Sequence, residues 1–338
     1  MKLPSPNELL AAATRLTKSG HLTEATATLQ RMLHGLGLPP THHPQPPPDA
    51  PPPAKDNSQF QARSFTNQAG TRPYKLYIPG PAHHGPRPLI VMLHGCTQSP
   101  DDFAAGTRMN AAAAAAGCYV AYPAQVAQAN AQKCWNWFNQ ADQQRDAGEP
   151  SLIAGITREV MHDHPIDPAR VFVAGLSAGG AAAAIMGEAY PDLYAAIGVH
   201  SGLACRAAAD MPSAFAAMQN GAPATARTGA RLVPTIVFHG DRDTTVNPAN
   251  GDAVVTQAVS GTSPHTRTEQ GQAPGGHPYK RTLYFDTAGR TVAENWTVQG
   301  GGHAWFGGSQ AGSFTDPRGP DATKEMLRFF LQHPLQPS

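Results

Sequence analysis

The chain has 338 residues, 41% of them hydrophobic, which is enough to bury the core of one large domain or two small ones. Its 25 Lys and Arg residues oppose 24 Asp and Glu residues, and the formal charge of +1 gives no electrostatic reason to expect nucleic acid or an anionic membrane as a partner. The 33 glycines and 33 prolines predict many turns and long loops.

The N-terminal segment has no basic region followed by an apolar run, so no secretory signal peptide is visible, and no stretch is long enough to span a membrane. We expect a cytoplasmic protein, with an extracellular one as the alternative. Apolar residues recur at helical spacing through residues 7–36, interrupted at Ser19 and Gly20. This pattern predicts a helical N-terminal extension over residues 1–37, which either packs on the catalytic domain or onto itself, or docks on a partner or an apolar particle surface.

Residues 38–54 are rich in proline and predict an extended linker, because proline excludes both a helix and a central strand. His42 and His43 are interpreted as polar linker residues, since no cysteine or acidic residue stands at a metal-ligand spacing from them. The sequence implies no metal ion and no cofactor. A catalytic domain is expected over residues 55–338.

Within this domain, short apolar runs alternate with helical ones, which is typical of a mostly parallel sheet flanked by helices. The fold class is therefore α/β. Strands are expected at residues 74–78, 88–94, 118–122, 171–174, 195–200 and 233–239, a hairpin at 281–286 and 291–298, and helices at 104–116, 153–163, 178–189 and 320–331.

The strongest local signal lies in residues 171–180, where an apolar strand leads into Gly-x-Ser-x-Gly and then into a helix-forming run. A serine lifted onto a tight turn between strand and helix needs small neighbours, here Gly175 and Gly179, because the backbone is strained and the helix passes close to the strand. The alternative is an ordinary glycine-rich turn. We interpret Ser177 as the nucleophile of an α/β-hydrolase fold.

A serine hydroxyl needs an imidazole to take its proton and a carboxylate to orient that imidazole, and in this fold the acid precedes the histidine. The strand at residues 233–239 ends in a loop that carries two candidates, Asp241 and Asp243. We prefer Asp243 as the acid, because His239-Gly240-x-x-Asp243 matches the usual acid loop of these hydrolases. Asp241 is expected to brace the turn.

His303 is the candidate general base, because it follows a predicted strand in a glycine-rich loop that leaves its ring free to reach across the sheet. The oxyanion of the tetrahedral intermediate needs N–H donors from the residue after the nucleophile and from the loop after an early strand. These are Ala178 and Cys96, with His94 expected to brace the loop. The remaining histidines considered are expected to be ordinary surface residues: His162, His164, His265 and His277.

Several motifs in a fixed order resemble the polyhydroxybutyrate (PHB) depolymerase family of esterases, which also contains feruloyl and acetylxylan esterases. The likeness covers about residues 60–333. The motifs that carry it are LHGCTQ at residues 93–98, CWNWF at 134–138, GLSAGG at 175–180, HGDRD at 239–243, GHAW at 302–305 and TDPRGPDA at 315–322.

The resemblance implies a serine esterase acting on a polyester or other ester, most closely like the single-domain or intracellular members. It further implies a disulfide between Cys96 and Cys134, with two reduced thiols as the alternative. Trp135, Trp137 and Trp305 are candidates for an apolar substrate groove, although aromatic residues also build cores. The alternatives are a feruloyl or acetylxylan esterase, and a granule-binding protein on a hydrolase scaffold whose N-terminal helices hold the granule surface.

Overall fold

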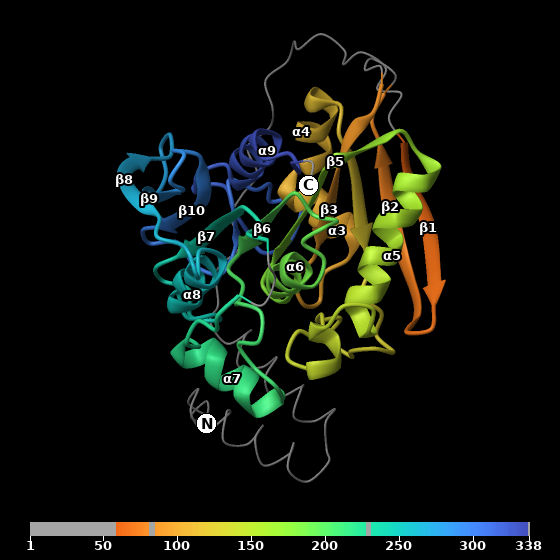
Figure 1. Ribbon diagram of the computed structural model, residues 1–338, viewed down its shortest axis with the longest axis horizontal. Helices are drawn as coiled ribbons and strands as arrows, with labels where there is room; N and C mark the ends of the chain where they lie inside the picture. The colour runs from red at the N-terminus through yellow and green to blue at the C-terminus, as the bar shows by residue number, and fades with distance from the viewer. Residues whose placement is uncertain (1–58, 81–84, 228–230, 337–338) are drawn as a thin grey trace, which may run out of the picture. The chain divides into compact units, whose positions relative to one another are not determined.

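The computed structural model describes residues 59–80, 85–227 and 231–336, which belong to one compact unit, Asp56–Ser338 (Figure 1). The expected helical extension of residues 1–37 and the expected linker of residues 38–54 lie outside the described residues.

A ten-stranded sheet forms the centre of this unit, in the order β1-β2-β4-β3-β5-β6-β7-β10-β9-β8. The strands from β4 to β10 in this order run parallel, and the strands at both edges are antiparallel. The strands are β1 Gln59–Asn67, β2 Gly70–Ile78, β3 Arg87–Leu93, β4 Tyr119–Pro123, β5 Ile166–Leu176, β6 Ala196–His200, β7 Thr235–Gly240, β8 His265–Gln272, β9 Pro278–Phe285 and β10 Thr291–Val298. This arrangement confirms the predicted α/β-hydrolase fold.

Helices cover both faces of the sheet, because the central strands bury side chains on both sides (Figure 1). One core contains residues of α5 Gly148–Asp163, α6 Ala178–Ala189 and α8 Ala249–Ala258. The other contains residues of α3 Pro100–Thr107, α4 Met109–Ala116 and α9 Ala322–Gln332. The remaining elements are η1 Gln140–Gln143, α7 Met211–Asn220 and the short parallel pair β11 Trp305–Phe306 and β12 Thr315–Asp316.

The helix expected at residues 104–116 is divided in two. Arg108 adopts a left-handed backbone with φ 56° and closes α3 by donating its N–H to the Ala104 carbonyl. The alanines on both sides favour a helix, so the sequence pattern runs through this break without a signal. His265, expected in a loop, lies in β8. No helix of the described residues is long and apolar enough to cross a membrane.

Candidate active site

The three candidate triad residues follow three parallel strands of the sheet, of which β7 and β10 are neighbours while β6 lies between β5 and β7. Ser177 comes directly after β5, Asp243 follows β7 and His303 follows β10. Because β5, β6, β7 and β10 run parallel and lie side by side, the loops after these strands meet at one edge of the sheet (Figure 1). This is the edge at which open α/β sheets place their functional groups.

Ser177 occupies a strained turn between β5 and α6, with φ 59° and ψ −120°. Its backbone N–H donates to the carbonyl of His200, at 2.9 Å, which fixes the turn against β6. A Cβ atom on Gly179 would lie 2.0 Å from the Leu93 carbonyl oxygen, and one on Gly175 would lie 2.2 Å from the Gly179 oxygen. Both positions therefore exclude side chains, as the strand-to-helix turn of a nucleophilic serine requires.

The candidate acid and base form a direct pair. His303 Nδ1 lies 2.7 Å from Asp243 Oδ2, and the His303 side chain is 11% exposed. A carboxylate only accepts hydrogen bonds, so Nδ1 carries the proton of the neutral ring. Nε2 then has a free lone pair, which is the form a general base needs.

Asp243 is buried, and four donors surround its two oxygens. Oδ1 accepts from the backbone N–H groups of Thr245 and Val246, each at 2.9 Å. Oδ2 lies 3.3 Å from His239 Nε2 in addition to His303. Burial by itself would raise the pKa of Asp243, but the hydrogen bonds from His239 and His303 hold this pKa well below its usual range. The carboxylate is therefore ionised at neutral pH.

Asp241, the competing acid, has a different partner. Its Oδ1 accepts from the backbone N–H of Gly300 at 2.6 Å, and its own N–H donates to the Val298 carbonyl. Asp241 thus fastens the loop after β7 to the loop that carries His303. This is the bracing role that the sequence predicts for it.

Two further buried histidines, His239 and His200, hold the site, and His239 contacts the acid directly. His239 Nε2 lies 2.9 Å from the Val246 carbonyl and 3.3 Å from Asp243 Oδ2, so it carries a proton and faces two acceptors. Its position at the end of β7, four residues before the acid, was the available signal.

His200 connects the nucleophile to the loop after the base. Its carbonyl accepts from Ser177, its Nε2 accepts from the Phe306 N–H at 3.1 Å, and its ring stacks on Phe238 and Trp305. Burial lowers the pKa of His200 well below its usual range, so the ring is neutral and its Nε2 remains an acceptor. Nothing in the sequence around His200 marks this role.

The loop after β3 lies against the nucleophile. A Cβ on Gly95 would lie 3.6 Å from the Ser177 Cβ. Within the described part of the chain, neither the Cys96 N–H nor the Ala178 N–H donates a hydrogen bond to another protein group. Two donors on either side of a serine are what an oxyanion hole contains. Gln98 holds the loop by accepting from the Gly95 N–H at 2.9 Å.

A disulfide joins Cys96 to Cys134, as the family resemblance implied. The buried Glu149 holds the loop that contains Cys134. Its carboxylate accepts from the backbone N–H and the side-chain amide of Asn136, at 2.7 and 2.9 Å, and from the Gln125 amide. Cys118 and Cys205 are buried free thiols.

His94 braces the loop after β3, as expected. Its Nδ1 donates to the Gly95 carbonyl at 2.7 Å, and its Nε2 accepts from the Gln125 N–H at 3.0 Å. Burial lowers the pKa of His94 to about 4. A neutral ring is therefore part of the folded loop.

The expected tryptophan groove is corrected by the structure. Trp135, Trp137 and Trp305 are 0%, 6% and 1% exposed. Trp135 Nε1 donates to the His94 carbonyl, and Trp305 Nε1 donates to Thr323 Oγ1 on α9. All three belong to the cores on the two faces of the sheet and offer no surface to a substrate.

The other histidines differ from one another. His162 is exposed, in line with the expectation of a surface residue. His277 departs from that expectation, since it is largely buried and its Nε2 lies 2.9 Å from Asp316 Oδ2.

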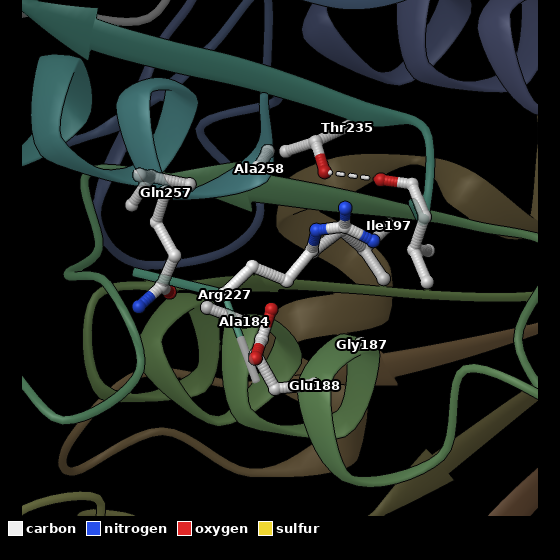
Figure 2. Close-up of a pocket in the computed structure, with 10 residues that line it drawn as sticks. Ala184, Gly187, Glu188, Ile197, Arg227, Thr235, Gln257 and Ala258 are labelled. Atoms are coloured by element: carbon white, nitrogen blue, oxygen red, sulfur yellow. Dashed lines mark hydrogen bonds between the residues drawn. The ribbon is translucent and has the colours of Figure 1, made fainter. Parts of the chain in front are cut away.

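A small cavity lies apart from these residues, between α6, β6, β7 and α8 (Figure 2). Arg227 and Glu188 line it, and its volume of about 20 Å³ holds a water molecule but no ester substrate. The cavity is therefore not a candidate for the substrate site.

Similar solved structures have the same fold. An acetyl xylan esterase from Aspergillus awamori aligns with a TM-score of 0.63 and 20% identity, over 80% of this chain and 99% of that one. An S-formylglutathione hydrolase from Agrobacterium tumefaciens aligns with a TM-score of 0.51 and 13% identity, over 83% and 97%.

Sequence relatives are more specific. Poly(3-hydroxyalkanoate) depolymerase C of Paucimonas lemoignei is 32% identical over 268 residues, which are 74% of this chain and 63% of that protein. Poly(3-hydroxybutyrate) depolymerase of Ralstonia pickettii is 29% identical over 67% of this chain and 49% of its own length. Feruloyl esterase B of Thermothelomyces thermophilus is 28% identical over 54% and 67%.

The alignments thus span between about half and two thirds of the length of the two depolymerases. The family described as "Esterase PHB depolymerase" matches residues 72–262, more than half of the sequence. The chain therefore belongs to the esterase PHB depolymerase family.

Proposed function

We propose that the protein is a serine-dependent carboxylic-ester hydrolase that cleaves poly(3-hydroxybutyrate) or related polyesters and oligomers. The observation that carries the proposal is the buried Asp243–His303 pair, which lies at the same sheet edge as the strained Ser177 turn. Such a pair turns a hydroxyl into a nucleophile at neutral pH.

The reaction proceeds in two steps. Ser177 Oγ attacks the ester carbonyl while His303 Nε2 takes its proton, and the N–H groups of Cys96 and Ala178 receive the oxyanion. His303 then returns the proton to the leaving alcohol, and an acyl-enzyme remains. Water, activated by the same nitrogen, attacks the acyl-enzyme, and the acid and the free serine are released. Asp243 stays ionised and holds the ring in the tautomer that both steps need.

The substrate proposal follows from the relatives, two of which are named as polyester depolymerases. The alternative is a feruloyl or acetylxylan ester, since relatives with those names also match and an acetyl xylan esterase has the same fold.

The test compares hydrolysis of 3-hydroxybutyrate oligomers and amorphous polymer with hydrolysis of p-nitrophenyl acetate and methyl ferulate, using wild type and Ser177→Ala. We expect turnover of the hydroxybutyrate substrates, reduced in the variant by roughly 10⁴-fold or more. Activity confined to ferulate or acetate would retain the mechanism and replace the substrate. Equal activity of the two proteins would remove Ser177 from the mechanism.

A further inference from the structure

Phe314 is unusual among the aromatic residues of this protein. It is 47% exposed, and within residues 59–80, 85–227 and 231–336 it is the only exposed phenylalanine, tyrosine or tryptophan. It belongs to neither hydrophobic core. About half of a large apolar side chain therefore faces water and lies outside both cores.

The backbone at Phe314 is strained as well. Its φ of 51° lies in the left-handed region, which a bulky side chain rarely occupies. The Phe314 carbonyl accepts from the Trp305 N–H at 2.7 Å, and the neighbouring Ser313 donates its N–H and its hydroxyl to Asp102, at 2.9 and 2.6 Å. These contacts hold the strained conformation in place. Strain retained for an exposed ring points to a function of that ring.

Hydrogen bonds connect Phe314 to both sides of the nucleophile. Trp305, which bonds the Phe314 carbonyl, stands two residues after His303. The Gln98 amide donates to the Ser313 carbonyl and hydroxyl at 3.2 Å, while the other end of Gln98 accepts from Gly95, next to Cys96. Residues 313 and 314 thus contact both the loop of the base and the loop of the oxyanion donors.

We propose that Phe314 is a substrate-binding residue that receives the apolar side of a polyester chain next to the ester being cleaved. The inference rests on the proposed function and adds to it a residue that selects extended apolar esters. A hydroxyalkanoate chain carries a hydrocarbon group on every unit and no charge along its length, so an exposed ring gains free energy by covering it. The acyl group of p-nitrophenyl acetate has only two carbons and offers no chain for the ring to cover.

The first test compares Phe314→Ala with wild type on a 3-hydroxybutyrate trimer, on amorphous polymer and on p-nitrophenyl acetate. The KM for the trimer should rise about tenfold, because the variant lacks the aromatic face that the bound substrate would cover. The kcat should change little. The parameters for p-nitrophenyl acetate should stay within about twofold of wild type. Leu331→Ala is the matched control, since Leu331 is 38% exposed and lies near the end of α9. This variant should leave the kinetic parameters for both the trimer and p-nitrophenyl acetate unchanged.

Phe314→Gly separates binding from folding. Glycine relieves the left-handed strain, so this variant should unfold at a temperature no lower than Phe314→Ala, yet bind the trimer as weakly. A residue with a purely structural role would give the opposite result, with a lower unfolding temperature and an equal loss on all esters. That result overturns the proposal.

The failure of this inference and that of the proposed function give different results. If wild type cleaves the trimer and Phe314→Ala cleaves it equally well, only the role of Phe314 is wrong. If wild type cleaves p-nitrophenyl acetate and leaves the trimer intact, the polyester substrate and the role of Phe314 are both wrong.

Discussion

The loops on one side of Ser177, residues 94–98 and 130–137, are held by a disulfide and by a buried carboxylate, Glu149. We call them the oxyanion side. The loops on the other side, residues 240–246 and 299–306, are held by hydrogen bonds among aspartates and histidines, and we call them the acid–base side. The two sides of one site are thus held differently, one by a covalent bond and a buried carboxylate and the other by hydrogen bonds among aspartates and histidines. The oxyanion side depends on the redox state of two cysteines, and the acid–base side depends on ionised groups.

The largest effect is expected on the acid–base side. Asp243→Asn should lower kcat/KM for any ester by about 10³- to 10⁴-fold, because an amide that donates to His303 favours the wrong tautomer of the ring. Asp241→Asn is the matched control, since its amide oxygen still accepts from Gly300, and it should lower kcat/KM by less than about tenfold. Steady-state kinetics of both variants checks this. A larger loss in Asp241→Asn would exchange the roles of the two aspartates.

On the oxyanion side, the Cys96→Ser/Cys134→Ser double variant should lose about 4 kcal/mol of unfolding free energy, because the disulfide closes a loop with a sequence separation of 38 residues in the unfolded chain. Its kcat should fall several-fold while KM changes little, since the Cys96 N–H is then less well positioned.

Urea unfolding and kinetics with and without dithiothreitol measure both effects of the disulfide. The reductant should lower the unfolding free energy and the kcat of wild type and leave both unchanged in the double variant. A wild type that keeps full activity after complete reduction would contradict the idea that the disulfide positions the oxyanion donors.

The oxyanion side also contains a buried histidine, His94, which should make the stability of the protein depend on pH. The pKa of His94 is about 4 in the folded protein and 6.5 as an unperturbed reference, so the unfolded chain binds a proton that the folded chain does not. The contribution of the neutral His94 to the free energy of unfolding is fully present above about pH 6.5. It falls by about 3 kcal/mol as the pH decreases to 4. His200 acts in the same direction.

Urea unfolding between pH 7 and pH 4 measures this dependence on pH. In His94→Gln, which cannot titrate at this position, the unfolding free energy should depend less steeply on pH. Identical slopes in the variant and wild type would assign the effect to other groups.

The smallest effect is expected at His239. His239→Phe removes the donor that lies 3.3 Å from Asp243, and kcat/KM should fall about tenfold with KM nearly unchanged. His239→Gln keeps an N–H at the end of the side chain and should recover part of the loss. Equal kcat/KM in the phenylalanine variant and in wild type would limit His239 to packing.

The parts of the fold that were predictable from the sequence are those with buried, repetitive patterns. The strand at 171–174 and the helix at 178–189 enclose Gly-x-Ser-x-Gly, and the structure has β5 and α6 there. The edge strands β1 and β8 were not predicted, because their outward side chains are largely exposed and polar and give no hydrophobic signal.

Only some of the residues of the candidate site could be predicted from the sequence. Motif order identified the candidate nucleophile, acid and base, because each stands at the end of a predicted strand. Residues that act through spatial neighbours, such as His200 with Phe306, have no such order in the sequence. The tryptophans show the same difficulty, since residue type says that they are apolar and does not say which surface they face.

The glycines around Ser177 bear on attempts to engineer this protein. A side chain at Gly179 or Gly175 would collide with backbone atoms, and a Cβ at Gly240 would lie 2.2 Å from the Gly301 oxygen. In a library of random substitutions, these positions should retain glycine in every active clone. Useful diversity for new ester substrates belongs instead at the exposed Phe314, whose side chain lies outside both hydrophobic cores.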